Sequence, residues 1–152
     1  CIRDETDTIL VPYSTGWNLV GLPLEVDNAS YNYLFPESID GTLYSFNDGY
    51  NSESELIAGE GYWLRFESAG NTTITGNSIS ELTISLNEGW NLITGISTPF
   101  DVIEINDPDE IIISGTIYEF TSGGYSNAEI LEPGKGYWIR TNNSGSIILI
   151  NE

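Results

Sequence analysis

Carboxylates are the side chains in this sequence best suited to chemistry, and the chemistry they favour is the binding of divalent cations. The chain has 23 Asp and Glu residues against 4 Lys and Arg residues, a formal net charge of −19. Calcium prefers several carboxylate, amide and backbone oxygens around it. Two short, loop-like stretches are densest in such oxygens, residues 100–110 and residues 46–55. We therefore predict a structural calcium site at one of these stretches.

The candidate metal ligands come from both acidic stretches. They are Asp101, Glu104, Asp107, Asp109 and Glu110 in the first stretch, and Asn47 and Asp48 in the second. Neither stretch has the spacing of a helix-flanked EF-hand loop. A solvated acidic loop that holds no metal therefore remains the alternative interpretation of each.

The residue types needed for most enzymatic mechanisms are missing. Histidine is absent, and the only cysteine is Cys1. This excludes Ser–His–Asp and Cys–His catalysis as well as ordinary zinc sites. Two carboxylates could hydrolyse a glycoside, but among 23 acidic residues some pair is unavoidable and so discriminates nothing. We predict that the protein is not an enzyme, and we keep a small acidic hydrolase as a remote alternative.

Net charge and hydropathy also bear on partners and location. A chain with 4 basic residues has almost nothing with which to displace counterions from nucleic acid, so nucleic acid is not an expected partner. No apolar run approaches the ~18 residues that a membrane span needs. Cys1 stands where an acylated, membrane-anchoring cysteine of a bacterial lipoprotein would stand. We expect Cys1 to act as an anchor or a crosslink in a secreted protein, with a chance position as the alternative.

The elements that carry these residues occur twice. GWNLVGLPL at 16–24 matches GWNLITGIS at 89–97, and GTLYSF at 41–46 matches GTIYEF at 115–120. GEGYWLR, which starts at residue 59, matches GKGYWIR, which starts at residue 134. The order is preserved, and the small drift in offset is what short loop insertions would produce. The chain is therefore an internal duplication.

Both copies have the pattern of short β-strands. Residues 81–92 alternate apolar and polar side chains and then break at a Gly-containing turn, which predicts a hairpin. We predict an all-β fold of two tandem homologous domains, each a small antiparallel β-sandwich or barrel-like unit. The first domain spans residues 8–80 and the second spans residues 81–152. Residues 1–7 form an N-terminal tail that could serve as an anchor or a donor strand.

Aromatic side chains recur at equivalent points of the two copies. The recurring tryptophans are Trp17, Trp63, Trp90 and Trp138. Tyr62 and Tyr137 each precede a Trp, and neighbours in a strand point to opposite faces, so one ring of each pair should fill the core while the other faces outward. We expect the tryptophans to be core anchors, because large rings are the main energetic resource of so small a unit. A sugar-stacking platform is the alternative.

Arginine follows the Tyr-Trp pair in both copies. Arg65 and Arg140 are two of the chain's 4 positive charges. We expect each to form a fixed ion pair with one of the many nearby carboxylates or a backbone contact, with a ligand-binding arginine as the alternative.

The motifs GWNL and, some forty residues later, LxxGxGYWxR resemble a repeat that is common in large secreted and cell-surface proteins of bacteria. The resemblance covers nearly the whole chain, twice. It implies an extracellular location and a β-rich structural or adhesive role, and it implies no catalytic residues.

We predict that the protein is a non-enzymatic extracellular structural subunit. It would self-assemble into a cell-surface polymer, such as a filament or a pilus-like fibre, with itself as its partner. Calcium at the acidic loops and strand addition from residues 1–12 or 146–152 would stabilise the polymer. The alternative is a carbohydrate-binding or adhesion module with a polysaccharide partner.

Overall fold

Antiparallel β-strands make up most of the computed structural model of the protein, which describes residues 6–47, 49–121 and 124–151. The predicted all-β class is confirmed. The first repeat contributes the strands β1 (Thr6–Tyr13), β2 (Gly16–Gly21), β3 (Leu24–Glu25), β4 (Tyr44–Phe46), β5 (Tyr50–Ser52), β6 (Gly61–Phe66) and β7 (Gly70–Ser78), and the short helix α1 (Tyr31–Leu34). Strand β1 begins at Thr6, so the last two residues of the predicted tail, 1–7, belong to a strand. Cys1 lies outside the described residues.

The second repeat follows nearly the same order of elements. It contributes β8 (Glu81–Leu86), β9 (Gly89–Thr94), β10 (Phe100–Asp101), the 3₁₀ helix η1 (Val102–Glu104), β11 (Tyr118–Thr121), β12 (Gly124–Asn127), β13 (Ile130–Leu131), β14 (Gly136–Thr141) and β15 (Gly145–Ile150). The short strands differ between the repeats: β10 pairs with β13 in the second repeat, whereas β3 pairs with β7 in the first. The regular strands are equivalent in the two copies.

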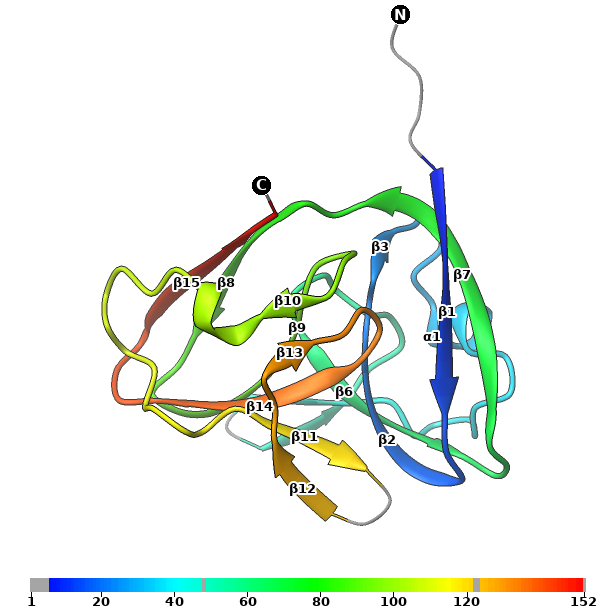
Figure 1. Ribbon diagram of the computed structural model, residues 1–152. Coiled ribbons are helices and arrows are strands. Elements are labelled where there is room, and N and C mark those ends of the chain that lie inside the picture. Colours follow the sequence, from blue (N-terminus) through cyan, green and yellow to red (C-terminus); the bar gives the residue numbers. More distant parts are fainter. Residues whose placement is uncertain (1–5, 48, 122–123, 152) are drawn as a thin grey trace, which may run out of the picture.

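Each repeat contains one four-stranded sheet, and these two sheets have equivalent topologies. The strand order is β2-β6-β4-β5 in the first repeat and β9-β14-β11-β12 in the second. A second layer is made by β1, β7 and β3 in the first repeat and by β8 and β15 in the second. In Figure 1, β1 and β7 lie on the right, β8 and β15 lie on the left, and the hairpin of β11 and β12 projects at the bottom.

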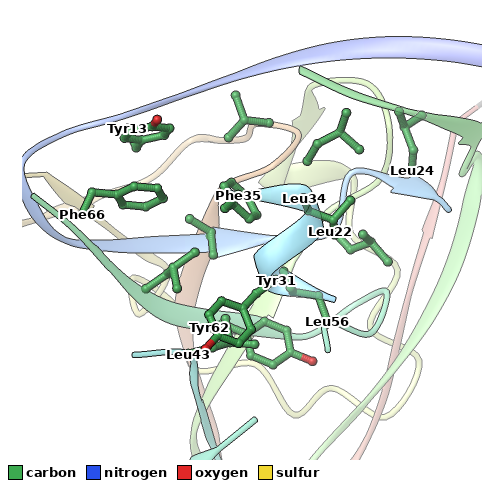
Figure 2. Packing of buried hydrophobic residues seen from close by; sticks show 14 residues of the cluster. Tyr13, Leu22, Leu24, Tyr31, Leu34, Phe35, Leu43, Leu56, Tyr62 and Phe66 are labelled. Carbon is green, nitrogen blue, oxygen red and sulfur yellow. The ribbon is translucent and has the colours of Figure 1, made fainter. Parts of the chain in front are cut away.

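Buried apolar side chains gather in two clusters between these layers. The first cluster takes its residues from positions 11 to 74 and the second from positions 79 to 149. In the first, the ring of Tyr13 stacks on Phe66 at 3.7 Å, and Phe35 meets Phe66 edge to face, as Figure 2 shows. Ala58 packs against both clusters, so the two cores touch. The division into two separate domains stays a prediction.

The GWN motif closes a tight turn in both repeats. Gly16 and Gly89 have φ angles of 95° and 101°, a left-handed conformation that favours glycine. The Asn18 side chain accepts a hydrogen bond from Ser14 N and donates to Ser14 O, both at 2.9 Å. Asn91 makes the matching bonds in the second repeat. The glycine and the asparagine thus form the turn, and the tryptophan between them is free to face outward.

No helix among the described residues is long and apolar enough to cross a membrane.

Candidate functional site

Two aromatic pockets lie on the outer face of the two four-stranded sheets. The first-repeat pocket is lined by Trp17, Tyr44, Tyr50, Trp63 and Phe120. The second-repeat pocket is lined by Trp90, Tyr118, Tyr125, Trp138 and Phe46. Their volumes are similar, about 390 and about 360 Å³ respectively. Each lining consists of two tryptophans, two tyrosines and one phenylalanine, so the duplication has produced two equivalent sites.

Each pocket is completed by a ring from the other repeat. Phe46 of the first repeat lies 5.1 Å from Trp138, and Phe120 of the second repeat lies 4.9 Å from Trp63. Phe46 and Phe120 are themselves equivalent positions of the GTLYSF and GTIYEF motifs. Neither pocket is therefore complete within one repeat.

Strand alternation places these rings on the outer face. In β6 the side chains of Tyr62, Leu64 and Phe66 enter the first core cluster, so Trp63 and Arg65 point the other way. Strand β14 repeats this arrangement. The prediction that each Tyr-Trp pair splits between core and exterior is confirmed, with Tyr62 1% and Tyr137 2% exposed.

The prediction that the tryptophans are core anchors is wrong. Trp17 and Trp90 are 42% and 41% exposed, and Trp63 and Trp138 are half-buried. The apolar anchors are instead the aliphatic residues together with rings such as Tyr62 and Phe66. The repetition of a large ring at equivalent positions indicates that the ring has a role in each copy. That role is either core packing or ligand binding, and repetition alone does not distinguish the two.

The rings in each pocket meet at steep angles. Trp17 and Trp63 are 6.2 Å apart at 86°, and Trp90 and Trp138 are 6.1 Å apart at 86°. Edge-to-face contacts of this kind suit the charge distribution of aromatic rings. Because the planes of the two tryptophan rings are nearly perpendicular, the rings bound the pocket on two sides. A group the size of one sugar or aromatic ring can fit between them.

The glycines of the GxGYW motif allow the two repeats to approach closely. A Cβ atom on Gly61 would lie 2.7 Å from the backbone oxygen of Ile93, and one on Gly136 would lie 2.9 Å from that of Val20. Real Cβ atoms do not approach backbone atoms so closely. The motif therefore serves the joint between the repeats as well as the fold of each repeat.

Reciprocal hydrogen bonds cross the same joint. Gly21 N donates to Gly134 O, and Thr94 N donates to Gly59 O, both at 3.1 Å. These two bonds are equivalent under the repeat, so each copy offers the other the same surface, as in a twofold interface. The joint thus fixes the two pockets relative to one another.

One position at the joint differs in charge between the copies. Lys135 donates from Nζ to Pro12 O at 3.0 Å, whereas the equivalent residue is Glu60. Burial lowers the pKa of Lys135, and Glu119 and Glu132 oppose that shift. Burial raises the pKa of Glu60, and repulsion from Glu53 raises it further.

Burial also raises the pKa values of the two core tyrosines of the GxGYW motif, that of Tyr137 to about 12. Each tyrosine hydroxyl accepts a backbone hydrogen bond, from Ile57 N at 2.9 Å in Tyr62 and from Glu132 N at 2.7 Å in Tyr137. The tyrosines remain neutral and hold the turn that precedes the motif.

Arginine flanks both pockets. Strand register places Arg65 opposite Trp17 and Arg140 opposite Trp90. The Arg140 guanidinium carbon lies 5.9 Å from the centre of the Trp90 ring, a cation–π contact. Within the described ranges, no carboxylate lies within 4.0 Å of either guanidinium group, so the expected ion pairs are not found there.

The predicted metal ligands that the structure describes form no metal-binding group. Among the described residues, no three side chains of His, Cys, Asp or Glu gather where they could hold a metal. The Asp107 carboxylate accepts hydrogen bonds from Ile111 N at 3.0 Å and Ile112 N at 2.9 Å, and so orders its own loop. Asp101 and Glu104 are exposed and line a shallow polar groove with Ile148.

The remaining candidate ligands that the structure describes have different surroundings. Asp109 lies beside Gly145, Glu110 has a φ of 54°, and Asn47 accepts from Asn87 Nδ2 at 3.3 Å. Asp48 lies outside the described residues. Calcium binding stays a prediction.

Six of the ten lining rings are tyrosines and phenylalanines that do not appear among the predicted binding residues. They are Tyr44, Phe46, Tyr50, Tyr118, Phe120 and Tyr125. Their recurrence in the two copies was visible in the sequence. The sequence does not reveal that β4 pairs with β6 and β11 with β14. These pairings bring the tyrosines and phenylalanines beside the tryptophans.

No family model matches the chain, and no curated protein or solved structure matches it.

Proposed function

We propose that the chain is a non-enzymatic extracellular adhesion module that binds carbohydrate in its two aromatic pockets. The observation that carries the proposal is the pair of equivalent pockets, each with five aromatic rings that include exposed tryptophans. Exposed apolar rings gathered in one patch mark a site of interaction, so the repetition of these pockets favours a ligand at each of them.

Sugar rings suit these pockets in shape and chemistry. The C–H faces of a pyranose ring are apolar and stack on aromatic faces, while its hydroxyl groups need hydrogen-bond partners. Tyr44 and Tyr118 supply phenolic hydroxyls within the linings. Each volume, about 360–390 Å³, suits a group of one or two sugar rings.

The charge and composition of the pockets favour binding over hydrolysis. Of the residues that the structure describes, those that line the pockets include no carboxylate, no nucleophile and no metal-ligand set. Glycoside hydrolysis requires two carboxylates that flank the scissile bond. The proposal therefore contains no catalytic step.

A glycan array tests this function. We expect the wild-type protein to bind a set of glycans and the Trp17→Ala, Trp90→Ala double variant to lose them. Tyr33→Ala is the matched control, because Tyr33 is 67% exposed and lines neither pocket. Glycan binding that survives in the double variant would contradict the proposal.

Self-assembly into a polymer stays a prediction from the sequence. The proposed donor segments already have partners within the chain, since β1 pairs with β7 and β15 pairs with β8. Donation of either strand into the sheet of another chain would first require that pairing to open. The mass of the protein in solution, with and without calcium, tests assembly independently of ligand binding.

A further inference from the structure

The aromatic face differs in charge from the rest of the molecule. Where strand alternation puts a described residue on this face of the two four-stranded sheets, that residue is never Asp or Glu, although the chain has 23 of them. The same face carries Arg65 and Arg140, two of the chain's 4 basic residues. Among the described residues, the strand positions of this face thus carry arginine and no carboxylate.

We propose that the pockets select an acidic sugar, a pyranose ring bearing an oxyanion such as the carboxylate of a uronic acid. The sugar ring would occupy the aromatic pocket, and its oxyanion would accept hydrogen bonds from Arg65 or Arg140. This inference rests on the proposed carbohydrate-binding function and adds the chemical class of the sugar.

The position of the guanidinium groups supports this assignment. Arg140 stacks on Trp90, a lining residue of the second-repeat pocket, with 5.9 Å between the guanidinium carbon and the ring centre. Arg65 stands opposite Trp17 in the equivalent register of the first repeat. The Arg140 guanidinium is therefore one ring away from its pocket. Arginine offers a planar pair of donors that matches a carboxylate, and stacking on a tryptophan orients that pair.

The net charge of −19 does not outweigh these local charges. At physiological ionic strength the screening length is about 8 Å, so carboxylates on other faces act only weakly at the pockets. An arginine beside the pocket acts within that distance. The net charge reduces the rate at which an anionic ligand approaches, and the local arginines determine which ligand stays bound.

Titration calorimetry with matched ligands tests the inference. Tetragalacturonate and its fully methyl-esterified form have the same rings and differ in charge, and a sulfated galactan tetrasaccharide carries the other common oxyanion. In calcium-free buffer we expect at least one of the two acidic ligands to bind about tenfold more tightly than the neutral ester. The acidic ligand that shows the preference identifies the oxyanion.

The arginine variants assign the preference to residues. Arg65→Gln with Arg140→Gln should abolish the preference, so that the acidic ligand binds no more tightly than the neutral ester. Lys135→Gln removes one positive charge at the joint between the repeats and should leave the preference intact. Equal binding of acidic and neutral ligands by the wild type would overturn this inference while the proposed function stands. A preference that survives in the double arginine variant would also overturn it, whereas failure of any glycan to bind would overturn both.

Discussion

The ring of Phe46, in the first repeat, lies 5.1 Å from the ring of Trp138, in the second, and the two rings meet edge to face at 74°. Phe120 and Trp63 make the equivalent contact in the opposite direction. Each repeat therefore supplies one lining residue, a phenylalanine, to the pocket of the other repeat. This relationship explains why the chain contains two copies joined without a spacer, since a single copy would have neither site complete.

Phe46→Ala should impair the pocket of the second repeat although Phe46 belongs to the first. In a Trp17→Ala background, where only the second-repeat pocket is intact, we expect Phe46→Ala to weaken glycan binding by about tenfold, the effect typical of losing an aromatic contact at a binding site. The measurement is the dissociation constant by calorimetry. In a Trp90→Ala background the same change should have a smaller effect, and a larger effect there would contradict the assignment of Phe46.

Gly61→Ala should destabilise the joint between the repeats. The added methyl group would lie 2.7 Å from the backbone oxygen of Ile93, so backbone must shift, at a cost of about 1–3 kcal/mol in the free energy of unfolding. Gly136→Ala, with 2.9 Å to Val20 O, should behave in the same way. Urea unfolding measures both, and Thr73→Ala on the exposed side of β7 is the control. If either glycine variant has the free energy of unfolding of the wild type, the backbones of the two repeats do not approach one another so closely at that glycine.

The sequence predicted the class of the fold and the positions of many strands and turns in each repeat. Both follow from the alternation of apolar and polar residues and from turn residues, which act locally. The predicted hairpin of residues 81–92 is wrong, because β8 pairs with β15 and β9 pairs with β14 in a different sheet. The Gly-containing turn before Gly89 and the split of Tyr62 from Trp63 across β6 are confirmed. These features depend only on neighbours in the chain. The aromatic pockets depend on contacts between distant segments, and no local pattern specifies which ring of one repeat reaches the other.

The misassigned tryptophans have a physical cause of the same kind. A large apolar ring stabilises a fold by burial or serves a ligand by exposure, and composition alone does not separate these roles. The deciding feature is strand register, which pairs Trp17 with Arg65 on one face while Tyr62 occupies the core on the other. That register is a property of the pairing between β2 and β6, which are distant in the sequence.

Glu60→Gln should stabilise the protein at pH 7 and lose that effect in acid. The pKa of Glu60 is raised in the folded state by burial and by Glu53, so the folded protein binds this proton more tightly than the unfolded chain does. A raised pKa contributes stability below the unfolded value and loses it as the pH rises through the folded value. We expect a higher melting temperature for the variant at pH 7 and no difference near pH 4. An equal difference at both pH values would contradict this origin of the effect.

Calcium should raise the melting temperature if the acidic loops hold it, because a ligand that binds only the folded state stabilises that state. The comparison is between millimolar calcium and excess chelator, with magnesium as the control for general charge screening. An Asp107→Asn, Asp109→Asn variant should lose the calcium effect if residues 100–110 form the site. An unchanged melting temperature in wild-type protein would exclude structural calcium.

The central claim is that two equivalent aromatic pockets, each completed by the other repeat, bind sugar. Calorimetric stoichiometry with a glycan selected on the array tests this claim most directly. We predict two binding events per chain for the wild type, one for Trp17→Ala and one for Trp90→Ala. For the Phe46→Ala, Phe120→Ala double variant, folded by circular dichroism, we predict that binding at both pockets is weakened about tenfold. Two undiminished binding events in that folded double variant would contradict the claim.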